Sequence, residues 1–136
     1  MAQYTKKVME HFLNPKNMGK IKDADGVGEI KNPVCGDITT IFIKVAKKKS
    51  KEREIEYIKD VKFKTLGCAA AIATSSVATE IAKGKSLDDA KRISSKDIIS
   101  SLGTLPAQKV HCSLLALDAL KKAIENYENK NPKKYL

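Results

Sequence analysis

Residues 61–85 read VKFKTLGCAAAIATSSVATEIAKGK, and their character changes abruptly at Gly67. Before this glycine, apolar and lysine side chains alternate, which is typical of a β-strand with one buried and one solvated face. After it the stretch is rich in alanine, which favours a helix, and Gly84 supplies a stop signal. The segment therefore predicts a strand that passes directly into a helix, with Cys68 at the helix entrance.

The residues before this segment supply partners for its strand. β-Branched and aromatic residues alternate with polar ones over residues 38–45, and a second alternating stretch covers residues 55–66. Together they predict an antiparallel hairpin, with residues 27–31 as the remaining candidate strand. The turn of this hairpin carries a run of basic residues: Lys47, Lys48, Lys49, Lys51 and Arg53. We expect a small antiparallel sheet of about three strands.

Helical patterns flank the sheet in the sequence. Residues 4–13 have helical spacing and end at an Asn-Pro pair, Ser86 caps a short helix, and a further helix is expected over residues 95–102. One apolar stripe marks a long C-terminal helix that ends before Pro132: Val110, Leu114, Leu117, Leu120, Ile124 and Tyr127. This order predicts an α+β fold in which several α-helices pack on one side of the sheet.

The length of 136 residues fits one domain over residues 1–136, with a mobile N-terminal segment of about residues 1–30 and a basic tail at about 130–136. No apolar run reaches the roughly 18 residues that cross a bilayer, and the first residues lack a secretory signal. We therefore expect no membrane partner and a cytoplasmic location.

The chain is basic, with 26 Lys and Arg against 16 Asp and Glu and a net charge of +10. The excess lies in the hairpin turn and in the tail, where it fits solvated surface charge. No recognition helix, zinc finger or aromatic-basic RNA motif accompanies it. We do not expect nucleic acid as the partner, and a basic nucleic-acid-binding module is kept only as a minor alternative.

Three cysteines lie at junctions between the expected elements: Cys35, Cys68 and Cys112. A domain of this size folds without disulfides, so an odd number of thiols indicates metal or sulfur chemistry in a reducing compartment. Helix entrances favour the reactive thiolate at Cys68 and Cys112. His111 beside Cys112 and Asp37 near Cys35 complete a ligand set that suits zinc or an iron–sulfur cluster.

Other interpretations of these residues stay open. No CxxC pair is present, so inert thiols and a capping or surface role for His111 are alternatives. His111 and Cys112 are adjacent on a helix, so their side chains should diverge by about 100°. This favours a role as ligands of one shared centre rather than as a catalytic pair. A pairing of Cys35 or Cys68 with His111 across space is a further alternative. His11 is interpreted as structural.

Several segments, in this order, together resemble one family. They are similar to iron–sulfur cluster assembly scaffolds of the IscU type, which also form the amino-terminal domain of NifU. The opening YTKKVMEHFLNPKNMG resembles the start of that family. The other matching segments are PVCGD at 33–37, FKTLGCAAAIATSS at 63–76, GKSLDDA at 84–90 and KVHCSLLALDALKKA at 109–123.

The resemblance implies a scaffold rather than an enzyme. Such a scaffold combines sulfur from a cysteine desulfurase with Fe²⁺ into a cluster, and passes the cluster to recipient apoproteins. Cys35, Cys68 and Cys112 match the cysteine ligands, and Cys112 also matches the persulfide acceptor. Asp37 matches the acidic residue implicated in iron binding and cluster lability, and His111 matches an additional ligand. A [2Fe-2S] cluster is expected, with [4Fe-4S] as the alternative and Zn²⁺ in the apo form.

The resemblance also implies partners: a desulfurase of the IscS or NifS type, recipient apoproteins, frataxin-like or ferredoxin proteins, and a second copy in a homodimer. Many members carry Leu-Pro-Pro-Val-Lys where this chain has Leu105-Pro106-Ala107-Gln108-Lys109. The change removes one proline and one apolar anchor, so we do not expect handover by the dedicated Hsp70-type chaperone. A zinc-containing sulfur acceptor of the SufU kind is the alternative function, but the compact spacing from Cys68 to Cys112 and the retained His111 favour IscU.

Overall fold

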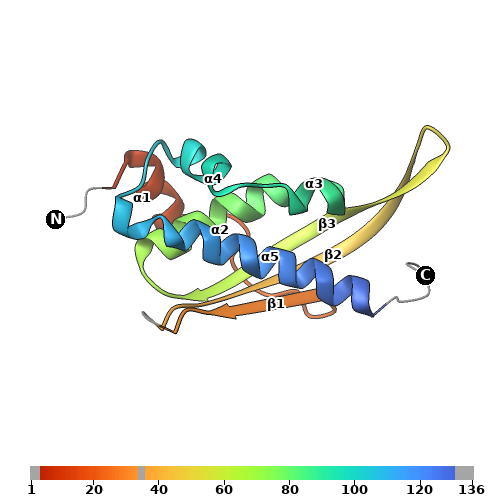
Figure 1. The fold of residues 1–136 in the computed structure, drawn as a ribbon, viewed down its shortest axis with the longest axis horizontal. Coiled ribbons are helices and arrows are strands. Elements are labelled where there is room, and N and C mark those ends of the chain that lie inside the picture. Colours follow the sequence, from red (N-terminus) through yellow and green to blue (C-terminus); the bar gives the residue numbers. More distant parts are fainter. Residues whose placement is uncertain (1–3, 34–35, 131–136) are drawn as a thin grey trace.

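A three-stranded antiparallel sheet with the strand order β1–β2–β3 forms the base of the structure (Figure 1). The computed structural model describes residues 4–33 and 36–130. The strands are β1 (Gly26–Lys31), β2 (Ile38–Ser50) and β3 (Arg53–Leu66). Ile41 faces Gly28 on one side and Phe63 on the other, and the side chains of Ile41 and Phe63 are fully buried. Alternation along the strands therefore gives one buried face, as predicted.

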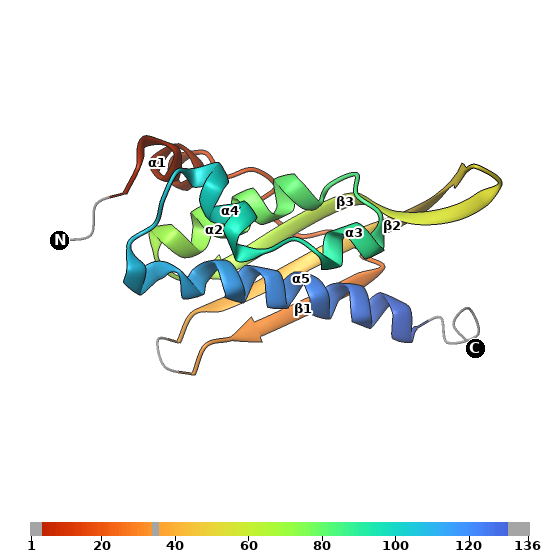
Figure 2. The same ribbon diagram turned by 45° about the horizontal axis from the view of Figure 1, so that its top comes forward.

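The helices gather on one side of this sheet (Figures 1 and 2). In the described part of the chain they are α1 (Lys6–Leu13), α2 (Ala69–Ala82), α3 (Leu87–Lys91), α4 (Ser95–Leu102), the short 3₁₀ helix η1 (Ala107–Lys109) and α5 (His111–Asn129). Ser86 and Ser94 cap α3 and α4 by accepting from the backbone N–H groups of Asp89 and Asp97. The predicted α+β fold with a long C-terminal helix is confirmed.

The long helix α5 lies directly on β1 because two glycines there leave room for its backbone. A Cβ atom built on Gly28 would stand 2.2 Å from the carbonyl oxygen of Ala119 and 2.3 Å from the backbone nitrogen of Ala123. The Val27 N–H also donates to Asn126 Oδ1 at 3.0 Å. This close contact fixes α5 on the sheet and with it the place of Cys112 at the start of the helix.

The hairpin of β2 and β3 is longer than its sequence pattern predicts. Its end, residues 47–54, projects from the body as an arm (Figure 2). Only Lys51 and Glu52 form the turn, with φ of 50° and 68°, so most of the expected basic turn is strand. Lys47 pairs with Glu54 at 3.5 Å across the arm. Residues 47–54, which form the arm, are exposed, so no apolar alternation marks this part of the hairpin in the sequence.

The buried face of α5 agrees in part with the predicted stripe. Leu117, Leu120 and Ile124 are buried as predicted, whereas Leu114 is 50% exposed and Val110 precedes the first residue of the helix. The helix buries several alanines instead, including Ala119 and Ala123, which the close contact with β1 requires. The predicted stripe contains only large apolar residues, whereas the tight contact between helix and sheet also requires small ones.

The first helix is tied to α2 by hydrogen bonds. His11 Nδ1 lies 2.7 Å from Ser76 Oγ, which also accepts from the Lys16 N–H at 2.8 Å. Thr5 caps the helix and donates to the Leu102 carbonyl at 2.6 Å. The structural role of His11 is confirmed, while the mobility expected for residues 1–30 stays a prediction.

Replacing Ser76 with alanine should loosen this attachment. The variant leaves the Lys16 N–H and the His11 ring without their partner, so we expect a loss of roughly 1–3 kcal/mol in the free energy of unfolding and faster hydrogen exchange in α1. Ser75→Ala is the matched control, because Ser75 Oγ is buried without a hydrogen-bond partner in the described residues and its removal should cost little. Equal unfolding midpoints for the two variants in urea would contradict the assignment.

Candidate metal centre

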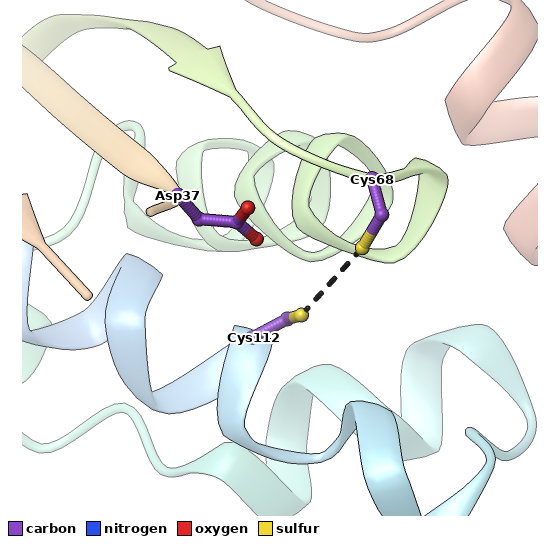
Figure 3. Close-up of side chains that lie close together, drawn as sticks. All are labelled: Asp37, Cys68 and Cys112. Carbon is purple, nitrogen blue, oxygen red and sulfur yellow. Dashed lines mark hydrogen bonds between the residues drawn. The ribbon is translucent and has the colours of Figure 1, made fainter. Parts of the chain in front are cut away.

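The starts of β2, α2 and α5 lie close together in the structure. Asp37 directly precedes β2, Cys68 is the residue at the entrance of α2, and Cys112 is the second residue of α5. The first residue of β2, Ile38, pairs with the last residue of β3, Leu66. This register brings Asp37 beside the junction between β3 and α2, and the packing of α5 on the sheet adds Cys112 (Figure 3).

The side chains of these residues converge. One ligand atom each from Asp37, Cys68 and Cys112 lies within 4.8 Å of the others, and the two sulfur atoms are 3.9 Å apart. Two thiolates at 2.3 Å from a shared tetrahedral zinc ion would be about 3.8 Å apart. The sulfur separation is too long for a disulfide, and both thiols are free. The geometry therefore fits ligation of a common metal centre.

The two thiols differ in how deeply they are buried. Cys112 is only 2% exposed, whereas Cys68 and Asp37 are half-buried and open the centre to solvent. Burial raises the pKa of the Cys112 thiol to about 12, with further contributions from the negative charges of Cys68 and Asp37. At Cys112, desolvation favours the neutral thiol and so opposes the thiolate that the helix entrance is expected to favour.

His111 approaches Cys112, contrary to expectation. Its Nε2 lies 3.8 Å from Cys112 Sγ, although the two residues are adjacent on the helix. The angle of about 100° per residue fixes the Cα–Cβ directions, but the imidazole nitrogen at the far end of its side chain can still reach the sulfur. Among the described residues, the close group consists of Asp37, Cys68 and Cys112, and His111 lies beside it.

Lys109 lies at this centre although no sequence motif predicts it there. The charge of Cys68 raises the pKa of the Lys109 ammonium, with Tyr4 and Cys112 contributing. The same cation opposes the rise in the pKa of Cys112. Its position at the end of η1, three residues before Cys112, was the available signal. Cys35 lies outside the described residues, so its participation stays a prediction.

These features define a class of protein, a small α+β domain with a thiol-rich candidate metal centre where two strand ends and two helix entrances meet. Within that class, the chain belongs to the family described as the NifU-like N terminal domain, whose model matches residues 3–134. The resemblance found in the sequence is thereby confirmed.

Named relatives agree with this membership. The chain is 57% identical over 130 residues to "Iron-sulfur cluster assembly scaffold protein IscU 1" of Archaeoglobus fulgidus, covering 96% of this chain and 80% of that protein. It is 48% identical over 125 residues to the IscU scaffold protein of Aquifex aeolicus, covering 92% and 76%. These names describe scaffold proteins and not enzymes.

A solved structure shares the fold. The crystal structure of a putative iron-sulfur cluster assembly scaffold protein for the SUF system from Fervidobacterium islandicum superposes with a TM-score of 0.69 at 27% identity. The match covers 89% of this chain and 96% of that chain. The higher identity to the IscU proteins leaves the SufU alternative less supported.

Proposed function

We propose that this chain is a scaffold on which an iron–sulfur cluster is assembled and from which the cluster is passed to recipient proteins. The observation that carries the proposal is the convergence of Asp37, Cys68 and Cys112 within 4.8 Å, in a chain whose relatives are named as such scaffolds. The cluster is the cargo of such a protein. It must be held firmly enough to form and loosely enough to leave.

The ligand set is suited to both demands. Cys68 and Cys112 would supply soft thiolates to iron, with Cys35 as the third thiolate and His111 as an additional ligand. Asp37 would add a harder oxygen ligand from a half-buried position that solvent reaches. The incoming Fe²⁺ would displace the proton of the buried Cys112 thiol, because a metal ligand must be deprotonated.

Lys109 would support this step. Its ammonium carries a positive charge near Cys68 and Cys112, whose thiols would lose their protons and become negative thiolates on binding iron. A nearby cation lowers the electrostatic cost of gathering negative ligands in a partly buried place. In the same scheme Cys112 would accept sulfur as a persulfide, and Zn²⁺ would occupy the same ligands before assembly.

The proposed scaffold role also implies partners, a cluster type and a cellular compartment. A cysteine desulfurase would donate sulfur, recipient apoproteins would take the cluster, and frataxin-like or ferredoxin partners and a homodimer would assist. We propose a [2Fe-2S] cluster and a reducing compartment such as the cytoplasm, in which Cys68 and Cys112 stay free. None of the helices in residues 4–33 and 36–130 combines the length and apolar character that a membrane crossing requires.

Anaerobic reconstitution tests the function. The chain is incubated with a cysteine desulfurase, L-cysteine, Fe²⁺ and excess dithiothreitol, which supplies the two electrons that convert persulfide sulfur to sulfide. Cluster formation is followed by visible absorption and Mössbauer spectroscopy. A visible chromophore at one cluster per chain or per dimer, transferable to an apo-ferredoxin, is the expected result. Sulfur uptake without a chromophore would overturn the proposal in favour of the SufU-like sulfur acceptor, and absence of both would remove either role.

Asp37→Ala should lengthen the lifetime of the assembled cluster. The carboxylate is the hardest ligand of the set, so its replacement by a softer neighbouring donor should slow cluster loss by about tenfold or more under chelator challenge. Asp118→Ala on the exposed face of α5 is the control and should leave the lifetime unchanged. An unchanged or shorter lifetime in Asp37→Ala would show that Asp37 does not confer lability.

A further inference from the structure

Gly67 lies between the last residue of β3 and Cys68, at the point where the strand passes into α2. A Cβ atom built on this glycine would stand 3.0 Å from both Cγ and Oδ2 of Asp37, and 2.9 Å from the Cβ of Ala71. The carboxylate of Asp37 therefore rests against the bare Cα of Gly67. Contacts this short mean that a methyl group at position 67 would require its neighbours to shift, although Gly67 itself is exposed.

The need for glycine here is one of space and not of backbone conformation. Among the described residues, the glycines with positive φ are Gly19, Gly36, Gly84 and Gly103, and Gly67 is not one of them. An alanine at position 67 can thus adopt the native backbone without the strain that a positive φ would impose. Its effect would come from the atoms that its methyl group meets.

Of the groups around position 67, the Asp37 carboxylate is the one that can give way. The pairing of Ile38 with Leu66 holds the backbone of Asp37 beside the junction. Ala71 is buried in the first turn of α2, the helix that Cys68 begins, so it cannot retreat without moving the helix. A methyl group at position 67 would therefore displace the carboxylate by at least a few tenths of an ångström from its place near the two sulfur atoms.

We infer that Gly67 is a positioning residue for the metal centre. Because Gly67 has no side chain, the Asp37 carboxylate can lie beside it, with an oxygen within 4.8 Å of the sulfur atoms of Cys68 and Cys112. Gly67 makes no bond to the metal and acts only through Asp37. The inference rests on the proposed function to the extent that Asp37 is a ligand there.

The test measures binding of Co²⁺ alone to the metal-free chain under anaerobic conditions. Ala71→Gly serves as the background of every variant, because it removes the contact between the new methyl group and α2. Co²⁺ affinity and the absorption bands of the bound ion are measured for this background, for Gly67→Ala, for Asp37→Ala and for both substitutions together. Thermal unfolding monitors the fold of each variant.

The expected result is a coupling between the two positions. Gly67→Ala should lower the Co²⁺ affinity by about 10–100-fold and change the ligand-field bands as Asp37→Ala does. In the Asp37→Ala chain the same substitution should have no further effect. An unchanged affinity in Gly67→Ala, or an equal loss with and without the carboxylate, would overturn the inference.

The two proposals fail differently. If Asp37→Ala leaves Co²⁺ binding unchanged, Asp37 is no ligand and the proposed centre fails together with the inference. If Asp37→Ala weakens binding and Gly67→Ala does not, only the inference fails. Should the position-67 variants not fold, nuclear Overhauser effects between the Hα protons of Gly67 and the Hβ protons of Asp37 in the unmodified chain test the contact. Their absence would overturn the inference.

Discussion

Cys112→Ser should abolish cluster assembly, with no visible chromophore after anaerobic reconstitution. The substitution keeps the size of the side chain but removes a sulfur that lies 3.9 Å from Cys68 Sγ at the buried side of the centre. No other thiol on α5 can replace it, since the helix holds one cysteine. We expect metal affinity to fall by more than the roughly 10–100-fold that loss of an outer partner costs.

The control for this variant separates ligand loss from damage to the fold. A buried serine hydroxyl without a partner costs about 1–3 kcal/mol, so Cys112→Ala is measured beside Cys112→Ser and should lose the cluster equally. Leu114→Ser changes an exposed residue on the same helix and should assemble the cluster normally. Normal assembly in Cys112→Ser would exclude Cys112 as a ligand.

Gly28→Ala should strongly destabilise the protein although it adds a single methyl group. That group would lie 2.2 Å from the Ala119 carbonyl oxygen and 2.3 Å from the Ala123 nitrogen, and both are backbone atoms of α5. The helix must therefore move off β1, which opens the core. We expect the free energy of unfolding in urea to fall by about 3 kcal/mol or more, at the upper end for overpacking.

Two comparisons make the Gly28 result specific. Val27→Ala alters the neighbouring residue on the exposed face of the same strand and should cost less than about 1 kcal/mol. Ala119→Gly should not rescue Gly28→Ala, because the clash is with the carbonyl oxygen and not with the alanine side chain. A full rescue by Ala119→Gly, or a loss no larger than in Val27→Ala, would contradict the proposed packing.

Most of the fold could be predicted because local pattern and tertiary structure agree there. The bounds of α4, residues 95–102, and the switch from strand to helix at Gly67 follow from capping and composition. The arm of the hairpin could not be predicted, because strands that face water on both sides need no apolar alternation. The buried face of α5 was predicted at Leu117, Leu120 and Ile124. Its alanines could not be predicted, because they are core residues only through the close approach of β1.

The candidate site was predicted in its residue types but not in its geometry. The sequence pattern places Cys68 and Cys112 at helix entrances, and both lie there. Side-chain packing, which the spacing of residues in the sequence does not encode, decides three further features. These are the approach of His111 to Cys112, the position of the Lys109 cation and the rise in the pKa of Cys112. Gly67 was recognised as a boundary between elements, whereas its contact with Asp37 exists only after folding.

The sequence by itself determined the kind of elements, their order and the thiol, imidazole and carboxylate groups at their ends, because these depend on residues close together along the chain. Only the tertiary structure decided that Asp37, Cys68 and Cys112 meet. Their meeting requires the register that pairs Ile38 with Leu66 and the glycines that let α5 lie against β1. Both are contacts between distant segments, and a ligand set of a few ångströms is set by such contacts rather than by local propensity.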